Sequence, residues 1–216
     1  RTQRWAERCV LRHEQLQKTQ VSAGRPPQAL FGIVQGGVYR HLRQQSAREL
    51  VQLDLPGYAI GGLAVGEPRT EMMTTIEETV PELPSHKPRY LMGVGLPQDL
   101  IDGVERGIDM FDCVIPTRNA RNSTLFTSTG RVRMKNAMHA DETSSLDAAC
   151  ECPTCTQYHR GYLRHLFQTN ELLALHLATY HNIHFFLNLM RSMRTAIIDG
   201  HFTDWRQAFF TTYQDV

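Results

Sequence analysis

Four short apolar runs, each followed by a glycine-rich or polar loop and separated by helix-forming segments, constrain this chain most. The runs lie at residues 29–34, 58–60, 89–92 and 107–115. Strands that alternate with helices predict a parallel sheet with right-handed crossovers. We predict the helices over residues 1–20, 41–53, 70–80 and 98–106.

A doubly wound sheet and a (β/α)8 TIM barrel both fit this alternation. No Gly-x-Gly-x-x-Gly opens a helix, which disfavours a dinucleotide-binding fold. Residues suited to a site follow each of the four runs, where a barrel keeps its active site: Gln35, Gly61, Gly62, Met92, Gly93 and Asp112. Because a full barrel needs about 250 residues, we predict an α/β fold in which residues 1–122 form the second half of a barrel.

The fourth run joins an acid to cations. In an extended strand one face would carry Ile108, Met110, Asp112 and Val114, and we expect this strand to be buried. A carboxylate in an apolar run is costly unless it is paired or used. Arg118 and Arg121 follow and are suited to phosphates. The residues alone support a catalytic Asp112 and a structural one, which caps a helix or pairs with Arg118, about equally.

The character of the chain changes after residue 122. Residues 124–134 alternate as a β-hairpin does, and a long helix is predicted over 171–199. Its predicted inward stripe is Leu172, Leu175, Thr179, Ile183, Phe186, Met190, Met193 and Ile197. We therefore predict a second domain over 123–199 and a C-terminal helix within 200–216.

Three of the five cysteines crowd together as Cys150, Cys152 and Cys155. An odd count with three close thiols suits a metal site in a reducing compartment better than a disulfide framework. Zinc prefers four tetrahedral ligands, so a fourth partner is needed. The long helix offers three histidines among which the pattern does not choose: His176, His181 and His184.

The formal net charge is only +1, so any nucleic-acid binding needs a local basic patch. No apolar run reaches the roughly 18 residues of a membrane helix. We therefore expect no membrane partner and a cytoplasmic location. The chain starts with Arg1 rather than Met, which we interpret as a processed or truncated start.

Four motifs precede the cysteine cluster: FGIVQGG at 31–37, GGLAVGE at 61–67, YLMGVG at 90–95 and DMFDCVIPTR at 109–118. In this order and spacing they resemble the bacterial tRNA-guanine transglycosylase (queuine tRNA-ribosyltransferase) family over essentially the whole chain. The resemblance implies a barrel with a structural Zn²⁺ subdomain, and a homodimer. It also implies exchange of guanine for preQ1 at the wobble position of tRNAs with a GUN anticodon.

The resemblance assigns roles to single residues. Asp112 would be the nucleophile that attacks C1′ of the ribose; Cys113 is a weaker rival because it points to the opposite face of a regular strand. The base would be bound by Gln35, Gly62, Leu63, Val65, Met92 and Gly93. The anticodon loop would be held by Thr117, Arg118 and Arg121. Zinc would be bound by Cys150, Cys152, Cys155 and His181, the last in a His-Asn pair.

Departures from the family limit these expectations. Ser123 stands where the family usually has Gly, which is costly if the position needs a positive φ. The family's N-terminal half, with its general acid/base aspartate, is absent, so we expect this chain alone to be inactive. The alternative is a non-catalytic, tRNA-binding accessory subunit; the presence of Asp112 and Gln35 favours the enzyme.

Overall fold

A computed structural model describes residues 1–214 of the chain, which divides into two compact units. The first unit is Arg1–Cys113 and the second is Val114–Val216. The division falls nine residues before the boundary predicted at 122, so the segment with Arg118 and Arg121 groups with the second unit. The predicted domains 1–122, 123–199 and 200–216 stay a prediction.

A four-stranded parallel sheet forms the centre of the first unit, in the order β1-β2-β3-β4. Its strands are β1 (Phe31–Val34), β2 (Gly57–Ile60), β3 (Arg89–Leu91) and β4 (Met110–Phe111). Its helices are α1 (Thr2–Ser22), α2 (Arg40–Val51), α3 (Arg69–Thr79), the 3₁₀ turn η1 (Val80–Glu82) and α4 (Pro97–Glu105). The α/β fold predicted from the alternation is confirmed.

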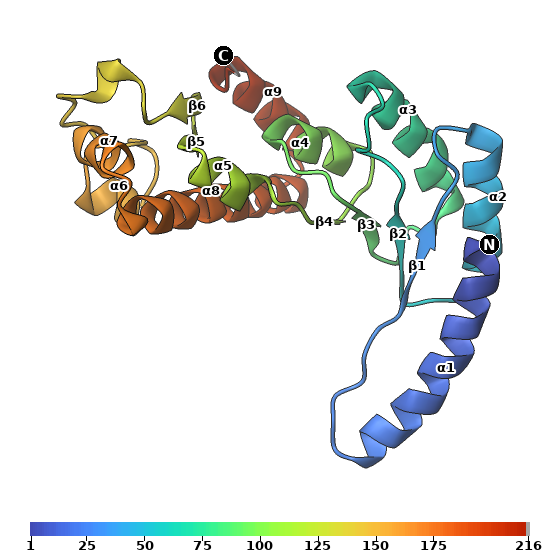
Figure 1. Ribbon diagram of the computed structural model, residues 1–216. Coiled ribbons are helices and arrows are strands. Elements are labelled where there is room, and N and C mark those ends of the chain that lie inside the picture. The colour runs from blue at the N-terminus through green and yellow to red at the C-terminus, as the bar shows by residue number, and fades with distance from the viewer. Residues whose placement is uncertain (215–216) are drawn as a thin grey trace. The chain divides into compact units, whose positions relative to one another are not determined.

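Strand order separates the two architectures that the sequence left open. The strands follow one another without a reversal, whereas a doubly wound sheet reverses at a switch point and carries helices on both faces. Right-handed crossovers that always step in one direction put every helix on the same face. Figure 1 shows α2, α3 and α4 together on one side of the strands. This is the arrangement of part of a barrel.

The core of the first unit lies between the sheet and these helices. Leu50, Tyr58, Ile60, Ile76 and Leu91 are fully buried there. Every residue of β2 is buried, as expected for a strand flanked by two others. In contrast, α1 buries none of its residues.

The fourth strand was predicted to be buried, and this is wrong for most residues of the predicted face. Ile108 is buried, but Met110 is 45% exposed and Val114 is 60% exposed. The strand is only two residues long and, among residues 1–214, pairs with β3 alone. Val114 already has helical dihedral angles as the N-cap of α5 (Ile115–Arg121), so the extended chain ends too soon for a regular alternation to persist.

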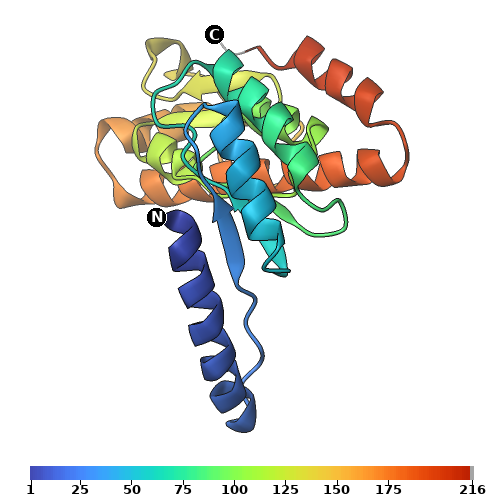
Figure 2. The same ribbon diagram turned by 90° about the vertical axis from the view of Figure 1, so that its right-hand side faces the viewer.

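The second unit is built on one long helix. Its strands form the predicted hairpin, β5 (Thr124–Thr127) with β6 (Gly130–Arg133). Its other elements are η2 (Ala137–His139), α6 (Pro153–Gln157), α7 (Arg160–Gln168), α8 (Leu172–Ile198) and α9 (Phe202–Thr212). Helix α5 and strand β5 lie along α8 (Figures 1 and 2). Within residues 1–214, no helix is long and apolar enough to cross a membrane.

The predicted inward stripe of α8 is also largely wrong. Phe186 and Met193 are buried, but Leu172 is 75% exposed, and Ile183 and Ile197 are exposed. The face that is buried carries, besides these two, Ala174, Ala178, His181, Asn182, Leu189 and Ala196. Small residues let α5 and β5 approach α8 closely, and those segments supply the backbone groups that satisfy the polar pair.

Candidate active site and metal centre

Asp112 follows β4 and is exposed to solvent. Its Oδ1 accepts a hydrogen bond from the Tyr90 hydroxyl at 2.6 Å and another from the Gly93 N–H at 3.0 Å. The Tyr90 bond and, after it, the Gly93 bond lower the pKa of Asp112, because they stabilise the ionised form. The same contact raises the pKa of Tyr90 to about 12. Asp112 is therefore an accessible carboxylate that stays ionised at neutral pH.

The loop after β3 supplies that backbone donor. Gly93 has φ +76°, which a residue with a side chain adopts only at a cost. Met92 beside it is half-buried, and its N–H donates to the Ile60 carbonyl at 3.2 Å. Of the predicted pair that follows β3, Gly93 contacts the carboxylate, and Met92 is bonded to the last residue of β2.

Gln35, at the end of β1, lies against the glycines that follow β2. A Cβ on Gly61 would lie 2.7 Å from Gln35 Nε2, and one on Gly62 would lie 2.7 Å from Gln35 Oε1. Gly62 also has φ +68°. The backbone conformation favours glycine at Gly62, and a side chain at Gly61 would push the Gln35 amide aside, so the two glycines bring peptide groups up to that amide.

Arg43 lies beneath this contact and was missed by sequence reasoning. It is fully buried on α2, and its guanidinium donates to four carbonyl oxygens: Gly37 at 2.6 Å, Gly61 at 2.7 Å, Gly62 at 3.2 Å and Val34 at 3.3 Å. Burial lowers its pKa to about 10, so it remains charged at neutral pH. Arg43 therefore ties the loop after β1 to the loop after β2.

The loop at 61–67 presents the large apolar side chain of Val65 to solvent. Leu63 is buried, whereas Val65 is 81% exposed. Glu67 accepts hydrogen bonds from the N–H groups of Ala64 and of Val65, the latter at 3.0 Å. Burial would raise the pKa of Glu67, but backbone hydrogen bonds outweigh it and lower the pKa. The carboxylate thereby holds a loop in which Ala64 has φ +58°.

The first unit brings its predicted site residues to one place because carboxyl ends of parallel strands share an edge of the sheet. Gln35 follows β1, Gly62 and Leu63 follow β2, Met92 and Gly93 follow β3, and Asp112 follows β4. This edge offers a nucleophilic carboxylate, an amide and exposed peptide groups. The set can attack an electrophilic carbon while it reads the hydrogen-bonding edge of a flat polar ring.

In the second unit, the three thiols and one histidine converge. His181 Nδ1 lies 3.3 Å from Cys155 Sγ, 3.5 Å from Cys152 Sγ and 3.8 Å from Cys150 Sγ. The four donor atoms all lie within 4.8 Å of one another and could hold a metal ion. Ligands of a tetrahedral zinc stand about 3.3 to 3.8 Å apart, given bonds of about 2.0 to 2.3 Å. Of the three candidate histidines, His181 is the one in this cluster.

His181 and its neighbour Asn182 are both fully buried, and backbone hydrogen bonds hold them in place. His181 Nε2 donates to the Phe126 carbonyl at 2.7 Å, which directs Nδ1 toward the thiols. Asn182 donates to the carbonyls of Pro116 at 2.9 Å and Thr124 at 3.1 Å, and accepts from the Phe126 N–H at 3.1 Å. Burial would lower the pKa of His181, but contacts with the thiols raise it to about 9. The chemistry and orientation of the donors fit zinc.

Two acids, the buried Asp147 and the half-buried Glu142, hold the loop that leads to the thiols. Asp147 accepts hydrogen bonds from the backbone N–H and hydroxyl of Ser128, at 2.7 and 2.8 Å, and from the Ala149 N–H at 3.0 Å. Glu142 is bonded to His139 and Arg160. These contacts fasten the segment before Cys150 to the hairpin and to α7.

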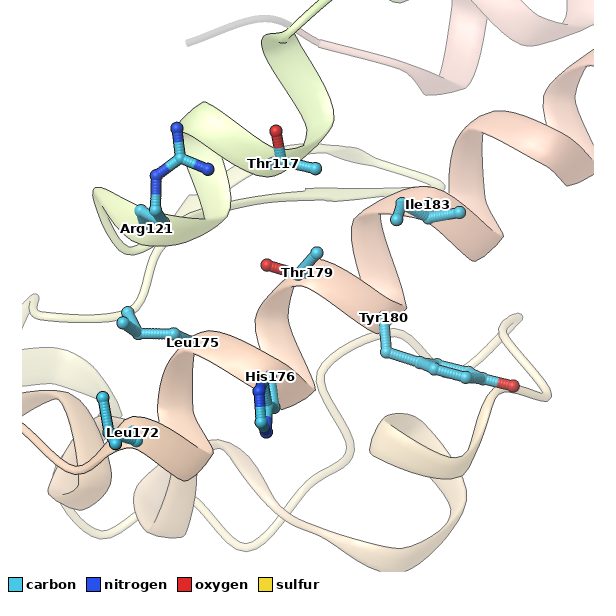
Figure 3. A pocket seen from close by; sticks show the side chains of 8 residues that line it. All are labelled: Thr117, Arg121, Leu172, Leu175, His176, Thr179, Tyr180 and Ile183. Carbon is cyan, nitrogen blue, oxygen red and sulfur yellow. The ribbon is translucent and has the colours of Figure 1, made fainter.

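The predicted tRNA contacts lie on α5, where Arg118 and Arg121 are exposed. Thr117 and Arg121 line a groove of about 670 Å³ (Figure 3). Its other lining residues come from α8: Leu172, Leu175, His176, Thr179, Tyr180 and Ile183. Ser123, just after α5, has φ +57°, so the position does adopt the conformation for which glycine is favoured.

Comparisons with known proteins agree on one family. A family model described as "Queuine tRNA-ribosyltransferase" matches residues 1–215. Proteins named queuine tRNA-ribosyltransferase from Listeria innocua, Bacillus cereus and Bacillus subtilis are 53%, 54% and 54% identical over 213 residues. Each alignment covers 99% of this chain but 54% of the relative. The chain thus spans about half the length of these curated relatives.

Proposed function

The chain belongs to the queuine tRNA-ribosyltransferase family, and we propose that it forms the nucleophile-bearing and metal-bearing part of a tRNA-guanine transglycosylase. The observation that carries the proposal is Asp112, an exposed carboxylate kept ionised by Tyr90 and Gly93 at the strand edge that also presents Gln35. The substrates would be the anticodon loop of a tRNA and the bases guanine and preQ1. We place this reaction in the cytoplasm.

The proposed reaction has two displacements at C1′ of one ribose. An oxygen of Asp112 forms a bond to C1′ while the bond to N9 of guanine breaks, and the electron pair leaves with the purine, which is then protonated. N9 of preQ1 next attacks C1′, loses its proton and releases Asp112. A carboxylate beside C1′ stabilises oxocarbenium character in both steps, and two inversions retain the configuration.

Base recognition would use the rest of the strand edge. The target guanine must leave its stack, and its edge is then read by hydrogen bonds. The Gln35 amide and the peptide groups of Gly62 and Leu63 provide donors and acceptors for that edge. Met92 and Gly93 would form the wall of the pocket. Arg43 would not touch the base but would hold the two loops that do.

Val65 bears on which base is inserted. The resemblance implies that bacterial members carry a bulky residue here and that queuine-using eukaryotic members carry Gly. The Val65 side chain is almost fully exposed and would occupy the space that a larger base substituent needs. We therefore propose preQ1 as the incoming base. Val65→Gly should improve the use of queuine, and an unchanged rate of queuine exchange would contradict this choice.

Binding of the tRNA would rely on α5 and the metal-bearing unit. Arg118 and Arg121 are exposed cations suited to the phosphates of an unpaired loop, and Thr117 lies on the same helix. Zn²⁺ would be held by Cys150, Cys152, Cys155 and His181 as a closed structural site. The metal would bind the thiolates tightly and stabilise the fold, and it would take no part in the displacements at C1′. A homodimer is part of the proposal.

The test is a covalent adduct on Asp112. This chain, completed with the remaining residues of the Bacillus subtilis relative, should form a denaturation-resistant complex with cognate tRNA. Asp112→Asn should abolish the adduct. Asp109→Asn is the matched control, because Asp109 lies on the same segment but accepts a hydrogen bond from the Arg89 N–H at 2.8 Å. An adduct that survives Asp112→Asn, or that needs Asp109, would refute the assignment.

A further inference from the structure

A fifth potential donor lies beside the four-residue metal cluster. His184 is half-buried on α8, and its Nδ1 lies 3.6 Å from Cys150 Sγ. It follows His181 by three residues, so both imidazoles project from the same face of the helix. His184 therefore approaches the metal cluster from the Cys150 side.

The neighbours of His184 set its tautomer. Arg191 donates to Asn188 Oδ1 at 3.1 Å, which directs the amide nitrogen of Asn188 toward His184 Nδ1 at 3.4 Å. An amide nitrogen is only a donor, so Nδ1 is the nitrogen with the lone pair and Nε2 carries the proton. The atom of His184 nearest the thiol is thus in the form that binds a metal.

Cys150 is also the thiol that is easiest to replace. Cys152 and Cys155 are buried, whereas Cys150 is half-buried. A cavity of about 270 Å³ is lined by Cys150, His184 and Asn188, among others. This space gives the imidazole room to move toward the donor position. The contacts of Cys152 and Cys155 with imidazole nitrogens are to His181.

We propose that His184 is a reserve metal ligand that takes the place of Cys150 when that thiol leaves the metal. The site would then hold zinc through two thiolates and two imidazoles, a set that zinc accepts as readily as three thiolates and one imidazole. The consequence is a structural metal that is harder to remove than one held by four donors alone. The inference rests on the proposed metal site and is independent of the tRNA chemistry.

The experiment measures zinc content and resistance to a chelator in this chain. Cys150→Ala should retain zinc in a one-to-one ratio after dialysis, with affinity lower by roughly 10- to 100-fold. Cys150→Ala with His184→Ala should lose it. Cys152→Ala is the matched control. It should lose zinc although His184 is present, because His184 lies beside Cys150 and not beside Cys152.

Two further readouts keep the test decisive if Cys150→Ala folds poorly. His184→Ala alone should bind zinc one-to-one but release it to a chelator several times faster than the unsubstituted chain. With cobalt in place of zinc, Cys150→Ala should keep a tetrahedral spectrum with about one third less thiolate charge-transfer intensity, since two of three thiolates remain.

The proposal is overturned if Cys150→Ala loses zinc as fully as Cys152→Ala. It is also overturned if adding His184→Ala to Cys150→Ala leaves zinc retention unchanged and His184→Ala alone leaves the rate of zinc release unchanged. If the unsubstituted chain binds no zinc, the proposed metal site itself is refuted. That result is separate from any result on tRNA exchange, so the two proposals fail in distinguishable ways.

Discussion

The two units hold their chemically important residues in opposite ways. In the first unit Asp112 and Val65 are exposed on loops, and hydrogen bonds from backbone groups and one tyrosine hold the carboxylate. In the second unit His181 is fully buried, and Cys152 and Cys155 are nearly so. Exposed residues can meet a substrate but contribute little to folding, whereas buried ligands do the reverse. Substitutions should therefore change reactivity in the first unit and stability in the second.

Loss of the metal should give the largest effect. Structural zinc contributes on the order of 10 kcal/mol to folding, comparable with the whole stability of a domain. Cys152→Ala, or removal of zinc by a chelator, should therefore unfold the second unit while the sheet of the first unit persists. Amide hydrogen exchange followed along the chain checks this. Cys9→Ala, an exposed thiol on α1, is the control, and equal protection of α8 with and without metal would contradict it.

Arg43 is an exception to this contrast, because it is a fully buried charge in the first unit. Arg43→Met would remove the guanidinium donor from four carbonyl groups, of which Val34 keeps the Gly61 N–H as a second donor, and should lower the free energy of unfolding by about 3 kcal/mol or more. Arg48→Met on the same helix is the control: its pair with Glu82 is exposed on the arginine side, so the cost should stay below about 1 kcal/mol. Denaturant unfolding measures both. Equal costs for the two variants would show that Arg43 does not hold the loops.

Tyr90 in the first unit tests the contrast directly, because we expect its hydroxyl to affect reactivity rather than folding. The nucleophile is the ionised Asp112, so activity should fall as the pH falls through the pKa of this carboxyl, which lies below its usual value. Tyr90→Phe removes a bond to the ionised form, so that pKa rises and the acid limb of kcat moves to higher pH. We expect a rate loss of up to about tenfold on the acid limb, where one pKa unit is a factor of ten, and little loss at neutral pH, where Asp112 is ionised in both proteins.

The measurement is the pH profile of guanine exchange by the chain completed with its Bacillus subtilis relative. Tyr39→Phe, at an exposed tyrosine, should leave the profile unchanged. A profile for Tyr90→Phe that keeps its acid limb while the rate falls at every pH would mean that the hydroxyl acts in some other way.

The sequence predicted the elements well because their signals are local. Apolar runs, glycine loops and helix periodicity depend on neighbours in the chain. The first three strands, the hairpin and the long helix occur close to their predicted bounds, whereas the fourth strand is shorter than predicted. Three thiols in six residues likewise predicted a metal cluster. Which histidine completes it could not be read locally, since that depends on β5 supplying the Phe126 carbonyl to His181.

Burial and supporting residues could not be predicted for the same reason. The inward stripe of α8 was assigned to its large apolar residues, but the helix buries Ala174, Ala178 and a polar pair because α5 and β5 approach that side. Arg43 reads as an ordinary helix surface residue until two strand ends bring carbonyl groups around it. Tyr90 lay within a recognised motif, yet its partner Asp112 is 22 residues away.

The smallest expected effect compares two residues that share one backbone conformation. Ser123 in the second unit has φ +57° and is buried, and Ala64 in the first has φ +58° and is exposed. Ser123→Gly should be more stable than Ser123→Ala by about 1 kcal/mol, because both lack the hydroxyl and only alanine keeps the strained Cβ. Thermal unfolding of the metal-loaded chain measures the difference.

Ala64→Gly should behave differently although it relieves the same strain. Ala64 belongs to a loop that Glu67 holds through backbone N–H groups, and a glycine there gives the loop more conformations to lose when a base binds. We expect a higher KM in guanine exchange with little change in unfolding. If Ala64→Gly instead stabilised the chain as Ser123→Gly does and left KM unchanged, the exposed loop would have no role in binding, and the contrast between the two units would fail where their geometry is most alike.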